Sequence, residues 1–389
     1  MAVINDIFLG EVRDLASDGR GVVVHPSGRT IFVDGVWVGE KGEFKITELK
    51  GRVGFAKIVD IHEASPQRIV PVCEHHGFGK NTCGGCPWQF MEYSAQLAAK
   101  QSRVTNELTR LNVSDQTQDI WPSSAAVGYR NRAQFKTDGT KLGFLAAHSR
   151  HITDVKDCVI LSDKNRETLS AMRETMPNSV WRVSSKDFKK QAWTSLDIDE
   201  STDISTVSVN QRLPFQQANS EQNQRMRDWL TTKLQEISVQ QPNGMSVLEL
   251  FCGAGNFTEI IAQMDNTHVL AVESVSAALA SLNAKKLSNV RTCEVNLFLE
   301  TAFEKIYNQQ RDFDVLVLDP PRDGLKNKKD LLPKKSKIKH VLYVSCDLAT
   351  FSRDLAYFQE NKFKVVEVQP LDQFPHTSHV ELMAYLSRA

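Results

Sequence analysis

The sequence has no net charge and no long apolar run. Its 47 basic and 47 acidic residues leave a formal net charge of +0 over 389 residues. The charge of the whole protein therefore cannot steer a polyanion, and any nucleic-acid binding must rely on local patches. No window of about eighteen unbroken apolar residues occurs, which argues against a membrane-spanning helix.

The chain also lacks the features of a signal peptide. Its opening, MAVINDIFLGEV, has no basic n-region and no apolar h-region. Seven cysteines are present, which is an odd number. We expect a monomeric cytoplasmic protein with no membrane partner, in which thiols stay reduced and clustered cysteines indicate metal binding or catalysis before disulfides.

Residues 1–63 are predicted to form a small β-barrel. Short β-like runs alternate there with glycine turns such as SDGRG and PSGR. Five strands at this spacing favour a closed barrel, although a β-domain without a specific role gives the same pattern. The expected strands cover 7–12, 21–24, 30–33, 42–48 and 55–61.

Three cysteines lie close together in the following segment. Cys73, Cys83 and Cys86 have the spacing Cys-x9-Cys-x2-Cys, and glycines between the last two allow the sulfurs to converge. Cys158 is the candidate fourth ligand, because the remaining cysteines lie in the C-terminal half. Zinc and iron–sulfur clusters both use four cysteines. A CGGC redox pair is a further alternative.

The rest of the central domain, residues 64–210, is expected to be rich in β-structure. A helix over 91–111 has the apolar spacing of a core-facing surface and could pack on the C-terminal domain. The stretch GYRNRAQFK, residues 128–136, is either a solvated strand face or a surface that meets phosphates. A weaker basic stretch covers 186–190.

Residues 211–389 alternate strands and helices. Repeated βα units predict a parallel, doubly wound sheet, so the fold class is α/β with a Rossmann-like C-terminal domain. The expected strands cover 246–251, 269–272, 313–318 and 341–344, and 363–368 and 380–386 are expected to form a closing hairpin.

The first βα turn, ELFCGAGNFT, suits an adenosine-containing cofactor. Gly253 lies where the backbone must approach a ligand, and Glu273 ends the second strand, where it can accept hydrogen bonds from a ribose diol. The turn does not match GxGxxG, which disfavours a dinucleotide. S-adenosylmethionine needs no pyrophosphate contact and fits better.

Cys346 follows a buried strand in the segment HVLYVSCD. A run of Val, Leu and Tyr followed by small and polar residues is typical of a parallel strand that brings a side chain to the open edge of a sheet. Chemistry occurs at the carboxyl ends of such strands. Cys346 is therefore a candidate nucleophile, and the alternative is a small buried hydrophobe.

The chain resembles the family of RNA uracil-C5 methyltransferases in five segments. They are FQQAN, LELFCGAGNFT, VLDPPRDGL, YVSCDLATFSRDL and QPLDQFPHTSHVELMAYL, in this order. The N-terminal region resembles a TRAM domain, an oligonucleotide-binding-like barrel attached to RNA-modifying enzymes. With the cysteine segment, the whole chain is similar to the iron–sulfur-containing ribosomal RNA branch. This resemblance implies methyl transfer from S-adenosylmethionine to C5 of a uridine, most closely in 23S rRNA.

The resemblance also implies roles for individual residues. Cys346 would be the nucleophile and Glu381 the general base. A [4Fe–4S] cluster would be held by Cys73, Cys83, Cys86 and Cys158, although the nine-residue first gap is longer than expected for this branch. The implied cofactor-binding residues are Gln217, Phe251, Asn256, Glu273, Asn296 and Asp319.

The reaction needs these residue types. A thiolate added to C6 makes C5 enolate-like, so that C5 can attack the methylsulfonium, and a base must then remove the C5 proton. The uridine must be flipped out or single-stranded to reach the cysteine. The basic run 326–339 flanks this edge and is either an RNA-contacting surface or a solvated helix face.

Three other functions are compatible with the same pattern. The first is the same chemistry on tRNA. The second is a non-catalytic RNA-binding assembly factor on this fold, which the presence of Cys346 and Glu381 disfavours. The third is a zinc-dependent binding module fused to a methylase of small molecules, which iron analysis would distinguish.

Overall fold

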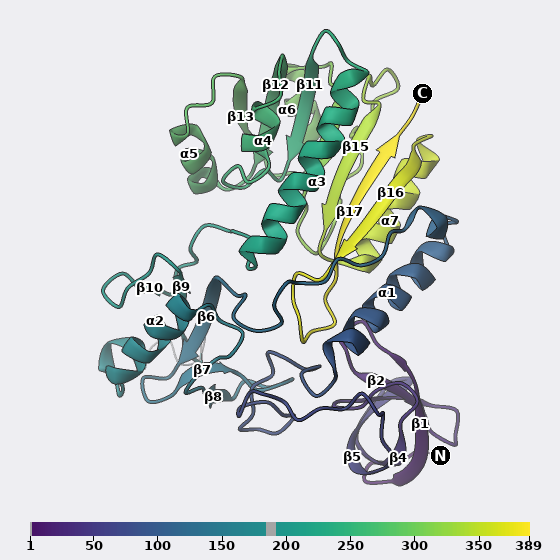
Figure 1. Ribbon diagram of the computed structural model, residues 1–389, viewed down its shortest axis with the longest axis vertical. Helices are drawn as coiled ribbons and strands as arrows, with labels where there is room; N and C mark the ends of the chain where they lie inside the picture. The colour runs from purple at the N-terminus through teal and green to yellow at the C-terminus, as the bar shows by residue number, and fades with distance from the viewer. Residues whose placement is uncertain (1, 184–191) are drawn as a thin grey trace. The chain divides into compact units, whose positions relative to one another are not determined.

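The computed structural model describes residues 2–183 and 192–389 (Figure 1). The basic stretch at 186–190 lies outside these residues. The described chain divides into two compact units. Unit 1 contains the chain up to Lys100, Ser124–Leu213 and Phe374–His379, and unit 2 contains Gln101–Ser123, Pro214–Gln373 and Val380–Ala389.

The N-terminal part of unit 1 is the predicted five-stranded closed barrel. β3 pairs with β5 in parallel, and the other neighbouring strands are antiparallel. Alternate side chains such as Val12, Ile31 and Phe44 are fully buried and form the barrel core. The strands are β1 (Ile7–Leu15), β2 (Gly21–Val24), β3 (Thr30–Val33), β4 (Lys41–Lys50) and β5 (Val53–Glu63).

The central part of unit 1 contains an antiparallel sheet of order β10-β9-β6-β7-β8, as the prediction of a β-rich region anticipated. Arg132, from the first basic stretch, pairs at 2.6 Å with the buried carboxylate of Asp197 on the neighbouring strand. The strands are β6 (Arg132–Thr137), β7 (Leu142–Leu145), β8 (Ile152–Asp154), β9 (Thr194–Asp199) and β10 (Ser208–Val209). The helices are α2 (Asp163–Glu174) and the short 3₁₀ turn η2 (Ser179–Trp181).

Unit 2 is built on a seven-stranded sheet of order β13-β12-β11-β14-β15-β17-β16. The first five of these strands are parallel, and β17 and β16 form the predicted antiparallel hairpin at one side. Figure 1 shows β15, β17 and β16 side by side. The strands are β11 (Met245–Leu250), β12 (Thr267–Glu273), β13 (Val290–Glu294), β14 (Val315–Leu318), β15 (His340–Ser345), β16 (Lys364–Leu371) and β17 (Glu381–Ser387).

Both faces of this sheet are covered by helices. Leu248 and Tyr343 join the core beneath α6 and α7, whereas their neighbours Val247 and Leu342 join the core beneath α3, α4 and α5. All residues of β14 and β15 are therefore buried, as expected for a doubly wound sheet. The helices are α3 (Ser220–Val239), α4 (Thr258–Ala262), α5 (Ser276–Ala284), α6 (Ala302–Gln309), α7 (Leu348–Glu360) and the 3₁₀ turn η1 (Ser114–Gln116).

Helix α1 (Tyr93–Thr109) begins in unit 1 and ends in unit 2. Its C-terminal residues Val104 and Leu108 are fully buried in the core of unit 2, which agrees with the predicted apolar face. The basic run 326–339 contains turns and no helix. No described helix has the length and apolar character needed to cross a lipid bilayer.

Candidate active site and cysteine centre

The predicted nucleophile and base lie at the same edge of the sheet of unit 2. Cys346 follows β15 directly, and the antiparallel strand β17 begins with Glu381. Ser345 pairs with Leu382, so Cys346 and Glu381 are the next residues opposite each other in this register. The chain turns into α7 immediately afterwards because the Asp347 carboxylate accepts a hydrogen bond from the Thr350 N–H at 2.9 Å and caps the helix.

Two further charged residues act on Cys346 at this edge. Asp319 and Arg322 follow β14, the strand next to β15. Burial, followed by the charges of Glu381 and Asp319, raises the pKa of the Cys346 thiol to about 12, whereas Arg322 acts to lower this pKa. Arg322 is therefore the cation that favours the thiolate. The sequence motif DPPRDGL contained it, but nothing in the motif indicated its partner.

The pKa values of the Asp319 and Glu381 carboxyl groups are also raised. Burial raises the pKa of Asp319 to about 7. Burial raises the pKa of Glu381 well above its ordinary value, Asp319 adds to this rise, and Arg322 opposes it. An acid whose conjugate base is disfavoured is a stronger base once ionised, which suits proton removal from carbon. Titratable groups with perturbed pKa values, clustered at the carboxyl ends of parallel strands, are typical of a catalytic site.

The turn after β11 is hydrogen-bonded to Glu273 at the end of β12. The Glu273 carboxylate accepts hydrogen bonds from the N–H groups of Gly253 at 3.2 Å and of Ser274 at 2.6 Å. Phe251 has a φ of +63°, Gly253 a φ of +54° and Gly255 a φ of +93°, so this turn places three residues at positive φ. The Phe251 ring lies 6.1 Å from that of Phe298 in the loop after β13. These loops meet at the cofactor edge predicted from the sequence.

The remaining predicted cofactor residues have defined partners within unit 2. The Asn256 side chain exchanges two hydrogen bonds with the amide of Asn223 on α3, at 2.9 and 3.1 Å. Asn296 lies two residues beyond β13, and its carbonyl oxygen accepts from the Phe298 N–H at 3.0 Å. Gln217 is buried, and its carbonyl oxygen accepts from the Gln373 amide at 3.2 Å.

A family model with the description tRNA (uracil-5-)-methyltransferase matches residues 190–389, about half of the chain.

The chain belongs to this methyltransferase family.

It is an S-adenosylmethionine-dependent RNA uracil-C5 methyltransferase. An uncharacterized RNA methyltransferase of Nitrosomonas europaea is 38% identical, over 97% of this chain and 96% of that protein. The 23S rRNA (uracil(1939)-C(5))-methyltransferase of Francisella tularensis subsp. novicida is 28% identical, over 98% and 97%.

One solved structure has the same fold over almost its whole length. The tRNA (uracil-54, C5)-methyltransferase of Pyrococcus abyssi, in complex with S-adenosyl-L-homocysteine, superposes with a TM-score of 0.68 and 22% identity. The match covers 97% of this chain and 99% of that one. The barrel, the central region and the Rossmann-like domain therefore occur together in a structure of this fold.

The four clustered cysteines of the methyltransferase lie around one small cavity in unit 1. Their thiols share it with apolar side chains and with two histidines; its lining includes Cys73, Cys83, Cys86, Cys158, His75, His76, Phe144, Val155 and Ile160. The Gly85 N–H donates to the Cys83 sulfur at 3.4 Å. Burial, together with repulsion from Cys83 and Cys73, raises the pKa of Cys158 to about 12. The four sulfurs are thus close enough for the charge on one to raise the pKa of the others.

No group of three or more His, Cys, Asp or Glu side chains in the described parts of the chain has a geometry that could hold a metal ion. The four cysteines predicted as cluster ligands thus line one cavity, but they do not form such a group.

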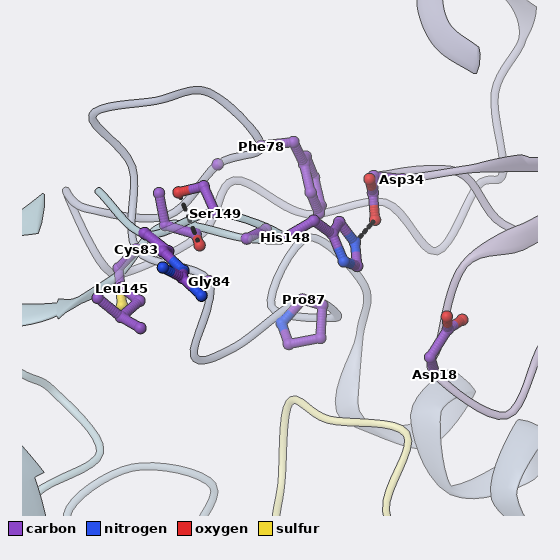
Figure 2. A pocket seen from close by; sticks show the side chains of 13 residues that line it. Asp18, Asp34, Phe78, Cys83, Gly84, Pro87, Leu145, His148 and Ser149 are labelled. Carbon is purple, nitrogen blue, oxygen red and sulfur yellow. Dashed lines mark hydrogen bonds and ion pairs between the residues drawn. The ribbon is translucent and has the colours of Figure 1, made fainter. Parts of the chain in front are cut away.

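A wider pocket adjoins the cysteine cavity at Cys83 (Figure 2). It lies within unit 1, and its labelled lining includes Phe78, His148 and Asp34. The His148 ring turns toward Asp34 and pairs with its carboxylate at 3.2 Å.

Proposed function

We propose that this enzyme forms 5-methyluridine in ribosomal RNA through a covalent bond between Cys346 and C6 of the target base. The observation that carries the proposal is the register of β15 and β17, which sets Cys346 opposite Glu381 at the carboxyl edge of the sheet. A relative named as a 23S rRNA methyltransferase, similar over nearly the full length of both chains, supports ribosomal RNA as the substrate.

The bonds change in four steps. The Cys346 thiolate adds to C6, and the electrons of the C5–C6 double bond move into the C4 carbonyl as an enolate. C5 then attacks the methyl group of S-adenosylmethionine, and S-adenosylhomocysteine leaves. The Glu381 carboxylate takes the C5 proton. The enolate that this forms restores the C5–C6 double bond and expels the thiolate.

Arg322 and Glu381 have distinct tasks in this scheme. Arg322 stabilises the Cys346 thiolate before addition, since it lowers the pKa of that thiol. Glu381 acts after methyl transfer, and its raised pKa makes the carboxylate a stronger acceptor for the C5 proton. The methyl donor would be held by Gln217, Phe251, Gly253, Asn256, Glu273, Asn296 and Asp319.

We also propose a [4Fe–4S] cluster held by Cys73, Cys83, Cys86 and Cys158. The support is the cavity that all four thiols line and the N–H group directed at Cys83. No step of the reaction consumes an electron, so the cluster would stabilise the cysteine loop. Seven free cysteines, with no disulfide in the described chain, suit a reducing cytoplasm.

A trapping experiment tests the catalytic assignment. Glu381→Gln keeps the thiolate and the methyl donor, so addition and methyl transfer should occur and elimination should stall. The variant is expected to remain covalently joined to methylated RNA as a slow band on a denaturing gel. Cys346→Ala should give neither the band nor methylation. Cys252→Ala is the matched control, because Cys252 is a buried cysteine at the cofactor turn, and it should retain turnover.

The outcomes of these experiments show which residues act as base and nucleophile and which class of RNA is methylated. Normal turnover by Glu381→Gln would show that another group removes the proton. An adduct formed by Cys346→Ala would show that another cysteine is the nucleophile, and Cys252 would be the next candidate. The alternative substrate is tRNA, because the Pyrococcus abyssi enzyme of the same fold is named as a tRNA methyltransferase. Mapping 5-methyluridine in both RNA classes from a deletion strain decides between them.

A further inference from the structure

Two buried polar atoms of residues that line the cysteine cavity have no hydrogen-bond partner among the described residues. They are Nε2 of Gln89 and Nε2 of His76. Gln89 is only 1% exposed, so its amide has no access to bulk solvent. A buried donor without a partner is costly in free energy, and such a group in a native protein indicates an unassigned interaction. Both residues belong to unit 1, as do the four cysteines.

The cysteine segment itself fixes the orientation of the Gln89 amide. The Gln89 carbonyl oxygen accepts from the Cys73 N–H at 2.9 Å, and the Gln89 backbone N–H donates to the Cys86 carbonyl at 3.2 Å. Because the Cys73 N–H requires an acceptor, the amide oxygen must face Cys73, and the NH₂ group is the end without a partner. Gln89 is thus bound to both ends of the segment 73–86.

The chemistry of this NH₂ group restricts its partner. It is a donor only, so the partner must be an acceptor. The apolar side chains of the cavity cannot serve, and a protonated thiol accepts only weakly. Metal-bound thiolates and the sulfides of a cluster are anionic acceptors, and hydrogen bonds to these sulfurs help to set the reduction potential of an iron–sulfur centre. The donors around the cavity therefore fit the proposed cluster, and a single buried water is the alternative partner.

We propose that Gln89 donates a hydrogen bond to a sulfur of this cluster and thereby stabilises its negative charge. The proposal rests on the cluster of the proposed function. The Gly85 N–H already donates to the Cys83 sulfur at 3.4 Å, and Gln89 adds a side-chain donor. A donor at sulfur favours the reduced, more negative form of the cluster, so Gln89 raises its reduction potential. Methyl transfer needs no electron, and the potential serves here as a probe of the contact.

The midpoint potential of the anaerobically purified enzyme, measured by voltammetry, tests the proposal. Gln89→Met keeps the approximate side-chain volume and removes the donor. We expect unchanged iron content and reduction that is about tenfold less favourable, which is about 59 mV for a one-electron couple. Gln134→Met is the matched control, because Gln134 is a half-buried glutamine of β6 outside the cavity lining, and it should keep the parent potential.

A measurement on the unaltered enzyme covers the case in which Gln89→Met loses its cluster. The enzyme is labelled with ¹⁵N in its glutamine side-chain amides, and dithionite supplies the one electron that makes the cluster paramagnetic. Pulsed EPR should then show coupling of the cluster spin to ¹⁵N, because Gln89 is the glutamine that lines the cavity. The coupling should persist in Gln134→Met and be absent from any Gln89→Met that retains iron.

Metal analysis of the parent enzyme separates failure of this proposal from failure of the cluster. If iron and sulfide are present but the labelled amide shows no coupling, or Gln89→Met retains iron and the parent potential, Gln89 is not a donor to the cluster and a buried water is its partner. Stoichiometric zinc without iron would overturn the cluster, and this proposal with it.

Discussion

The surroundings of the proposed catalytic groups disfavour the charged forms that the proposed reaction needs. Burial raises the pKa of Cys346 to about 12, and the carboxyl groups of Glu381 and Asp319 are raised for the same reason. Arg322 is the group that opposes both the Cys346 and the Glu381 shifts. The methyl donor carries a sulfonium cation, which acts in the same direction as Arg322. We therefore expect the Cys346 thiolate to form more readily when the methyl donor is bound beside it.

A pH profile measures this effect. Because the Cys346 thiol is protonated below its raised pKa, the rate of adduct formation should rise with pH, about tenfold per unit while the thiolate is the minor form. Arg322→Gln removes the stabilising cation, so its profile should be displaced to higher pH. Arg322→Lys keeps the charge and should lie close to the parent. The rates are measured as single-turnover formation of the RNA–protein adduct. If the pH profile of Arg322→Gln coincides with that of the parent enzyme, Arg322 does not stabilise the thiolate.

At the scale of elements, the turn between β14 and β15 depends on one buried carboxylate of α7. Asp354 is fully buried and accepts from the Leu325 N–H at 2.8 Å and the Tyr343 hydroxyl at 2.9 Å. Lys328 and Arg353 also pair with it, at 2.7 and 3.0 Å. The carboxylate therefore fixes the loop that carries Asp319 and Arg322 against the helix that follows Cys346.

Gly324 makes this arrangement possible. Its φ is +64°, and a Cβ added there would lie 2.5 Å from an Asp354 carboxylate oxygen. Gly324→Ala should destabilise unit 2 by about 3 kcal/mol, from left-handed strain plus the steric overlap. Gly253→Ala is the matched control, since Gly253 also has a positive φ but open space around it, and it should cost about 1–2 kcal/mol. Denaturant unfolding of both variants compares them, and equal losses would show that the overlap is relieved elsewhere.

Local patterns predicted most elements of this chain. The glycine turns placed all five barrel strands, and the apolar runs placed β14, β15 and the final hairpin, because each depends on residues adjacent in sequence. The strand pattern also indicated Cys346, and the family resemblance implied Glu381 and Asp319, which the structure places at the same edge of the sheet. The basic run 326–339 contains no helix; within it, Lys328 pairs with Asp354 and the Leu331 carbonyl accepts from the Tyr307 hydroxyl at 2.6 Å.

Local sequence patterns could not predict contacts between residues that are distant in the sequence. Gln96 and His376 are 280 positions apart, and a glutamine within a helix gives no sign of which backbone group it will meet. Arg322 was visible only as part of a motif, because its effect depends on charges from other strands. The same applies to Asp354, which resembles an ordinary polar residue of an amphipathic helix until its four partners are known.

At the scale of the whole molecule, the two units are joined by a chain that passes between them several times. The cysteine loop and the segment 374–379 are both parts of unit 1, and the Trp88 N–H connects them by donating to the His376 carbonyl. Trp88 is also fixed by its indole N–H, which donates to the Gly19 carbonyl at 2.8 Å.

Loss of the proposed cluster should loosen this connection. Anaerobically purified protein is expected to contain about four irons per chain and matching sulfide, and Cys158→Ser should remove the iron and its visible absorbance. Without the cluster, Cys86 no longer restrains Trp88, so amide exchange should quicken at Trp88 and along 374–379. Cys293→Ser is the control, because Cys293 is buried in the core of unit 2, and it should keep iron and slow exchange. Stoichiometric zinc without iron would overturn the cluster, whereas iron loss with unchanged exchange would show that the cysteine loop holds Trp88 without it.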